Sequence, residues 1–244
     1  MIRRLVVLLT VGVVAAGCAT SVVPGSTAPA SLKPIESVSP NPSMSPSMAL
    51  VPLSDGNGRG IAQVTLPSDW MIVTYVDIAT GESQAAWLGR HSAIHSDQLP
   101  PIVGMMHSEG FILFAADSVN TVDGFTPTLN ATVSDVPLAA GGIEKWLAEQ
   151  SARITKKYSL STPLAYTPFK AAEADHLSGY TASLRLDLQG KALAGTQIVI
   201  PGLGAGNSAL FSRALVLVFS CRVGQVEQYQ KIVEGIIGSL TPAP

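Results

Sequence analysis

The chain has 244 residues, room for one sizeable domain or two small ones, and 47% of them are hydrophobic. That share is enough to build and bury a core, so intrinsic disorder of the whole chain is excluded. Charged residues make up only 13% and the formal net charge is −2, so the chain lacks the basic surface that binds nucleic acids. Its two cysteines are too few for a disulfide framework or a cysteine-rich metal site, and we expect no cofactor.

Residues 1–17 have the pattern of a secretory signal peptide. Arg3 and Arg4 give a basic start, residues 5–16 carry no charge, and small residues follow. A transmembrane helix needs roughly 20 apolar residues. This stretch is shorter, since it lies between the two arginines and a Ser- and Pro-rich tract. We therefore expect the segment to be removed on export.

The sequence Ala15-Ala16-Gly17-Cys18 at the end of this segment resembles the lipobox of bacterial lipoproteins. The resemblance implies that Cys18 is diacylglycerated and becomes the first mature residue. Two or three acyl chains, such as palmitate, would then anchor the chain to the extracytoplasmic face of the cell membrane, at ~0.8 kcal/mol per buried methylene. Because Ala15 stands where lipoboxes usually have Leu, the alternative is ordinary cleavage that releases a soluble secreted product.

The mature chain is expected to begin with a lipidated N-terminus and a disordered tether, residues 18–59. Ser, Pro, Ala and Met dominate the tether, so it cannot bury enough apolar area to offset its ordering entropy. Some forty residues at ~3.1 Å each reach up to roughly 100 Å. Loss of Arg3 and Arg4 leaves 13 basic and 17 acidic residues, a net charge of −4 that does not attract anionic lipid headgroups.

Residues 60–244 are expected to form one domain, which opens with β-strands. Apolar runs of strand length, closed by turn residues, predict strands at 61–66, 70–75, 111–116 and 128–133. The last two are expected to pair as a hairpin. The period then changes to that of an amphipathic helix over 143–158, whose apolar face consists of Ile143, Trp146, Leu147, Ile154 and Tyr158.

After this helix the strand pattern returns, at 180–188, 196–200 and 215–219. The last of these strands is apolar on both faces, which is typical of a central strand covered on both sides. A second helix closes the chain, with an apolar face formed by Val226, Tyr229, Val233, Ile236, Ile237 and Leu240. Strands joined by hairpins, with helices between and after them, predict the α+β class: an antiparallel β-sheet flanked by helices.

Two short motifs and the closing helix resemble the PsbP-like fold, an α/β/α sandwich. The motifs are Leu66-Pro67-Ser68-Asp69-Trp70 after the first strand and Phe125-Thr126-Pro127-Thr128-Leu129-Asn130 at the start of a strand before the helix. The family they indicate is the actinobacterial cell-envelope lipoproteins of the LpqN type. The resemblance implies a noncatalytic binding or assembly factor in envelope biogenesis or lipid transport, and it transfers no catalytic residue. The segment from Asp77 to Gly110 is longer than the family usually has.

One group of residues has the spacing of metal ligands. His91 and His95 are four residues apart and would share one helical face, with Asp97 and His107 nearby. No Glu follows His91, as a zinc protease requires, and histidines in a polar loop are usually solvated. With no other catalytic set in the sequence, we expect neither a metal site nor an enzyme.

Two other patterns have a structural explanation. Cys221 lies in an apolar strand, so we expect a buried, inert thiol. Residues 202–206, Gly-Leu-Gly-Ala-Gly, look like a dinucleotide loop. A strand and not a helix follows them, so we expect a flexible loop between strands.

The segment from Asp77 to Gly110 also contains large apolar side chains, among them Trp87, Met105 and Met106. We expect these side chains to be buried in the core. The alternative is an exposed rim that binds a ligand or a partner.

Together these features predict a lipid-anchored envelope protein that acts as a noncatalytic binding or assembly module. Its expected partners are the membrane, through Cys18, and an envelope protein. The alternative is a carrier of an apolar ligand such as a lipid. High hydrophobic content and low charge favour a carrier, which requires an internal cavity that a close-packed core would not have.

Overall fold

The structure is a computed structural model, and it describes residues 47–75, 99–188 and 190–244. The strands are β1 (Met48–Ser54), β2 (Gly60–Pro67), β3 (Met71–Thr74), β4 (Phe111–Ala116), β5 (Thr128–Pro137), β6 (Thr167–Phe169), β7 (Gly179–Leu188), β8 (Lys191–Ile200), β9 (Phe211–Arg222) and β10 (Thr241–Pro242). The helices are α3 (Leu99–Glu109), α4 (Gly142–Tyr158) and α5 (Val226–Gly238), the last preceded by the 3₁₀ turn η1 (Val223–Gln225).

The main sheet has seven strands in the order β3-β4-β5-β9-β8-β7-β6. Each strand pairs antiparallel with its neighbours. The expected hairpin of β4 and β5 is confirmed, and β9, which was expected to be central, is the middle strand. The predicted class, α+β with an antiparallel sheet flanked by helices, is therefore confirmed.

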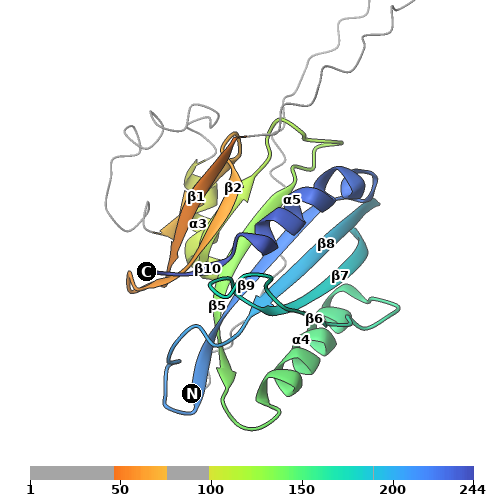
Figure 1. Ribbon diagram of the computed structural model, residues 1–244. Helices are drawn as coiled ribbons and strands as arrows, with labels where there is room; N and C mark the ends of the chain where they lie inside the picture. Colours follow the sequence, from red (N-terminus) through yellow and green to blue (C-terminus); the bar gives the residue numbers. More distant parts are fainter. Residues whose placement is uncertain (1–46, 76–98, 189) are drawn as a thin grey trace, which may run out of the picture.

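Helices cover both faces of this sheet (Figure 1). Along β9, Leu215, Leu217 and Phe219 belong to the same apolar cluster as Tyr229 and Ile236 of α5. The intervening residues, Ala214, Val216 and Val218, belong to the cluster that contains Trp146 and Ile154 of α4. The two-residue alternation of β9 thus separates a layer with α5 from a layer with α4.

A second sheet, in the order β1-β2-β10, packs beside α5. Val51 and Leu53 of β1 are buried in the core, Leu53 completely. The prediction that the tether extends to residue 59 is therefore wrong over Met48–Ser54. Prolines and serines upstream conceal a strand in which alternate residues face the core.

Helix α3 was not predicted. It packs on β4, where Ile102 and Met106 join an apolar cluster with Phe111 and Phe114. Prolines at its second and third positions suggest a loop in the sequence. Proline nevertheless suits the first turn of a helix, because the N–H groups of that turn have no hydrogen-bond partner within the helix. Gly110, with φ of 70°, ends the helix in the left-handed conformation that glycine adopts without strain.

The helix predicted over 143–158 is confirmed as α4, and the C-terminal helix as α5. Helix α4 ends because Ser159 turns into the left-handed region, where its N–H donates to the carbonyl oxygen of Thr155. None of the described helices is both long and apolar enough to span a membrane.

Candidate functional site

The structure tests only some of the residues that the sequence singles out. Cys18, His91, His95 and Asp97 lie outside the described residues, so the lipidation of Cys18 and the fate of these histidines stay predictions. His107 is described: it is exposed in the last turn of α3.

Cys221 lies near the end of β9 and is 2% exposed. Burial raises the pKa of its thiol to about 11, so the thiol is protonated and weakly nucleophilic at neutral pH. The predicted burial of this cysteine is confirmed.

Residues 202–206 join β8 to β9, as expected. Gly202 and Gly204 have φ of 81° and 94°, values that glycine adopts without strain. The chain then enters β9 at Phe211, so this stretch places no helix N-terminus where a pyrophosphate could bind.

The expected burial of the apolar side chains before Gly110 is confirmed for Met106 and Ile102. Met106 is 1% exposed and Ile102 is 4% exposed, whereas Met105 is half-buried. Trp87 lies outside the described residues. Ile102 and Met106 therefore serve the core and not a binding rim.

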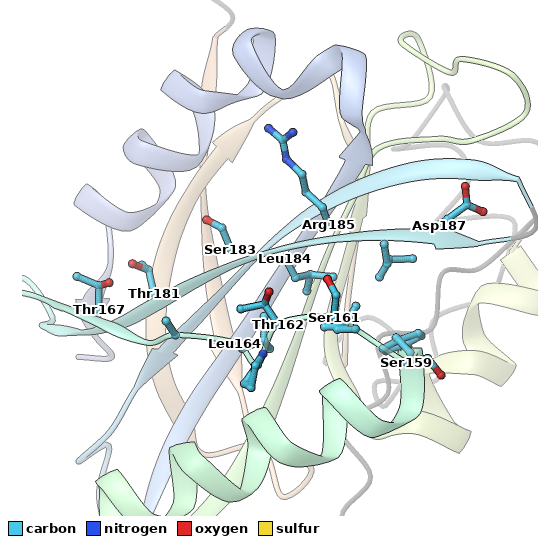
Figure 2. A pocket seen from close by; sticks show the side chains of 15 residues that line it. Ser159, Ser161, Thr162, Leu164, Thr167, Thr181, Ser183, Leu184, Arg185 and Asp187 are labelled. Carbon is cyan, nitrogen blue, oxygen red and sulfur yellow. The ribbon is translucent and has the colours of Figure 1, made fainter.

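A groove of about 870 Å³ runs along β7, between this strand and the segment that joins α4 to β6 (Figure 2). We call it the edge groove. Figure 2 shows Ser183 and Arg185 on one side of β7 and Leu184 on the other. Its lining consists of residues 158–165, Thr167, Thr181 and residues 183–187.

The edge groove exists because β6 is too short to cover β7. β6 pairs only with residues 179–181 of the ten-residue strand β7, and Pro168 in its middle has no N–H to donate. Beyond Thr181 none of the described strands pairs with the outer edge of β7. No backbone hydrogen bond joins the described residues 159–165 to this edge.

The opposite wall of the groove is fixed to α4. Ser151 of α4 donates a hydrogen bond of 2.8 Å to the carbonyl oxygen of Leu164, and the N–H of Leu160 donates to the carbonyl oxygen of Thr155 over 3.0 Å. Leu164 is buried against the sheet, whereas Ser161, Thr162 and Pro163 are exposed. The groove thus has two defined walls.

The side chains of the edge groove suit binding better than acid–base chemistry. Its charged side chains are Arg185 and Asp187, both exposed, and most of its other polar groups are serine and threonine hydroxyls. Burial, with the negative charge of Glu109, raises the pKa of Tyr158 to about 12. This phenol therefore keeps its proton at neutral pH, and among the lining residues no nucleophile is paired with a base.

A second groove, of about 420 Å³, lies between α5 and the sheet. We call it the α5 groove. Phe219 and Cys221 of β9 and Tyr229 and Val233 of α5 are part of its apolar lining. Arg185 lines both grooves, so the two lie on adjacent sides of the same strand.

On the face of the sheet that carries α3 and α4, a row of buried polar side chains follows β5. Asn130, Thr132 and Ser134 are each at most 6% exposed. The Asn130 Oδ1, Thr132 Oγ1 and Ser134 Oγ atoms have no hydrogen-bond partner among the residues that the structure describes. Ordered water is the usual partner of such groups.

One described cluster brings potential metal ligands together. Ligand atoms of Glu173, Asp175 and His176 lie within 4.8 Å of one another. His176 Nε2 lies 3.2 Å from Glu173 Oε2. Both carboxylates are exposed, so the cluster is adequately explained as a surface ion pair.

The sequence did not reveal the edge groove. The alternation of β7 predicts the strand, but whether the edge of a strand is covered depends on the length of its neighbour. The available signal was Pro168, because a proline marks an edge strand or a position that cannot donate to a ladder.

Comparisons with known proteins give structural likenesses at low identity. LpqN of Mycobacterium tuberculosis, described as involved in cell envelope biogenesis, is 12% identical with a TM-score of 0.42 over 81% of this chain and 92% of LpqN. A protein from Bacteroides thetaiotaomicron is 11% identical with a TM-score of 0.40 over 82% of this chain and 50% of its own. The PsbP protein of Synechocystis sp. PCC 6803, CyanoP, is 7% identical with a TM-score of 0.37 over 85% of this chain and 99% of CyanoP.

No family model matches the sequence, and no curated protein matches it. Membership of the LpqN-type family therefore stays a prediction.

Proposed function

We propose that this protein is an exported, lipid-anchored binding module of the cell envelope, and that it is not an enzyme. The basic start, the uncharged stretch and Cys18 after small residues support export and anchoring. The domain then presents its binding surface outside the cell membrane.

The observation that carries the proposed binding function is the edge groove. It combines a stretch of the β7 edge that no described strand covers, a fixed opposite wall and two charged side chains without a catalytic arrangement. When another chain covers such an edge, the backbone N–H and C=O groups lose their hydrogen bonds to water. A partner that adds a β-strand replaces these with hydrogen bonds to its own backbone. A site of this kind binds another chain.

Site-specific crosslinking in the intact envelope tests the proposal. A photoreactive residue replaces Thr162 in the full chain, at an exposed position that lines the edge groove but not the α5 groove. A second variant carries it at Glu149, exposed on α4. We expect a discrete protein adduct from position 162 and none from position 149. If a correctly anchored chain gives no specific adduct from any position lining the edge groove or the α5 groove, the domain is not a binding module.

A carrier of an apolar ligand is the second candidate, and the α5 groove favours it. The apolar side chains of Phe219, Val226 and Val233 line this groove, and Arg185 lies in its lining, which suits an apolar chain with an anionic end. Native mass spectrometry of the full chain carrying Cys18→Ala, purified gently from its envelope, separates the candidates. A stoichiometric extra mass that disappears on denaturation supports the carrier, whereas a bare chain supports the binding module.

A further inference from the structure

The edge groove also indicates what kind of partner it fits. This inference rests on the proposed binding function and deepens it. We propose that an extended peptide segment of a partner protein adds to β7 as an antiparallel strand opposite residues 183–187. The segment alternates in the order basic, apolar, acidic, apolar, hydroxyl from its N-terminus.

The backbone groups that point into the groove can be assigned. In an antiparallel strand, alternate residues direct both N–H and C=O to the same side. Pro168 cannot donate, so the residues of β7 that exchange hydrogen bonds with β6 are Gly179 and Thr181 and not Tyr180, which lies opposite Pro168. By the same alternation Ser183, Arg185 and Asp187 present their N–H and C=O groups to the open edge.

The hairpin of β7 and β8 agrees with this assignment. Only two residues separate Leu188 from Lys191, which are opposite each other. The pair that closes a two-residue hairpin is normally hydrogen-bonded. Even-numbered residues of β7 therefore bond to β8, and odd-numbered residues are left for a partner.

The groove is large enough for a single strand. An extended chain rises ~3.4 Å per residue, lies ~4.8 Å from its neighbour and, with ~10 Å across its side chains, takes up roughly 160 Å³ per residue. A groove of about 870 Å³ therefore has room for a segment of several residues, and the open stretch from Ser183 to Asp187 is five residues long. A second copy of this chain fits less well. If the β7 strand of that copy paired with this edge, its own β8 would lie on the far side of the added strand, in the space that the segment 159–165 occupies as the opposite wall.

The side chains of β7 specify the partner's sequence. Arg185 has no ion-pair partner among the described residues, so an acidic residue opposite it gains a cross-strand pair. Asp187 accepts a hydrogen bond from the N–H of Gly190 through Oδ1, which leaves its other oxygen for a basic residue. On the other face, Leu184 and Leu186 favour apolar neighbours.

Peptides carrying the core Lys-Val-Glu-Val-Thr test the inference through backbone methylation. In the antiparallel register their Glu lies opposite Arg185 and exchanges two backbone hydrogen bonds with it. We expect N-methylation of that Glu to weaken binding to the full Cys18→Ala chain about tenfold or more, by removing a donor and adding bulk. N-methylation of either Val, whose N–H points away from β7, is the matched control and should leave the Kd within about twofold.

Charge exchange tests the register independently. Arg185→Glu should weaken binding of this peptide about fivefold or more, and a peptide with Lys in place of Glu should recover the loss. Lys145→Glu, the same charge change on the exposed side of α4, should have no effect. Recovery by the exchanged pair is not expected from a variant that merely fails to fold.

The results that would overturn the inference are distinct from those that would remove the proposed function. Equal effects of N-methylation at Glu and at Val would overturn strand addition and leave a binding module. So would the absence of peptide binding in a chain that gives no adduct from position 162 but captures a partner through the α5 groove. Self-association that Arg185→Glu abolishes, measured by sedimentation, would assign the edge to a second copy. Aggregation of Arg185→Ala without any peptide binding would mean that the charges only protect the edge.

Discussion

At the scale of single residues, buried polar contacts fix how the layers of the domain meet. Asp55, in the turn after β1, accepts the N–H groups of Asn57 and Arg59, both at 2.9 Å. Its Oδ2 atom lies 2.5 Å from the Nη1 atom of Arg213 on β9. Burial raises the pKa of Asp55, but the two N–H donors and the Arg213 guanidinium outweigh it and hold this pKa below its usual value.

Replacing Asp55 by Asn should destabilise the domain by about 2–3 kcal/mol, because Arg213 loses a charged partner within a mostly buried contact. Asp123→Asn is the control: Asp123 pairs with Arg222 but is 72% exposed, so about 1 kcal/mol or less is expected. Urea unfolding at pH 7 measures both. Similar losses of unfolding free energy in the two variants would mean that burial does not strengthen the contact between Asp55 and Arg213.

The lowered pKa of Asp55 also predicts how stability depends on pH. Its contribution is complete above the unfolded-state pKa of about 4 and is lost as the pH falls through the lower pKa of the folded state. We therefore expect the difference in unfolding free energy between the parent chain and Asp55→Asn to shrink on acidification from pH 5 towards pH 2. A difference that stays constant over this range would contradict the assigned role of the charge.

Tyr229 attaches α5 to the sheet through a second buried contact. Its hydroxyl donates to Asp117 Oδ2 over 2.5 Å, and Tyr229 is 1% and Asp117 4% exposed. Burial, together with this hydrogen bond and the carboxylate charge, raises the pKa of Tyr229, so the phenol stays protonated as a donor.

Tyr229→Phe should cost about 1.5–3 kcal/mol, because it removes the donor from a buried carboxylate. Tyr180→Phe, at a half-buried position of β7, should change the unfolding free energy by about 0.5 kcal/mol or less. Denaturant unfolding of the two variants provides the measurement. If they lose equal stability, the contact between Tyr229 and Asp117 does not hold α5.

At the scale of secondary-structure elements, regular patterns were enough to locate most of the strands and two helices. The alternation through residues 180–188 and the helical period through 143–158 survive in the structure because each element buries one face. Helix α3 was missed because prolines at its start resemble a loop, and β1 because Val51 and Leu53 follow a Pro- and Ser-rich stretch. In both cases tertiary packing overrides local composition.

Strand β1 provides the test of the corrected domain boundary. Leu53 is 0% exposed and Leu50 is 61% exposed on the same strand. Leu53→Ala should therefore destabilise the domain by about 2–5 kcal/mol, the cost of a core cavity, and Leu50→Ala by about 0.5 kcal/mol or less. Thermal or urea unfolding of the full chain compares them. If neither substitution changes the unfolding free energy appreciably, residues 48–54 belong to the tether and not to the domain.

The candidate site could not be predicted from any one element. Strand β7 has the same alternation whether or not another strand covers its edge. What exposes Ser183–Asp187 is the early end of β6 and the course of residues 159–165, held by Ser151. These are relations between segments, and the sequence carries only the partial hint of Pro168.

At the scale of the whole molecule, the proposed anchor at Cys18 and the proposed binding domain would act through their separation. Because β1 begins at Met48, about thirty residues join it to Cys18, and at ~3.1 Å each they reach at most about 90 Å. This is shorter than the reach of a tether that extends to residue 59. A lipidated chain would search for its partner within this distance of the membrane, which raises the effective concentration of a weak, peptide-sized contact.

Replacing Cys18 by Ala should move the protein from the membrane pellet to the soluble exported fraction. The acyl chains are the expected attachment, because the mature net charge of −4, from 13 basic and 17 acidic residues, repels anionic headgroups. The parent chain should for the same reason stay in the pellet in 1 M salt, since salt screens charges but leaves acyl burial intact. Cys221→Ala, which alters only the buried cysteine of β9, should remain with the membrane like the parent chain. A Cys18→Ala chain that still sediments with the membrane would place the attachment elsewhere in the protein.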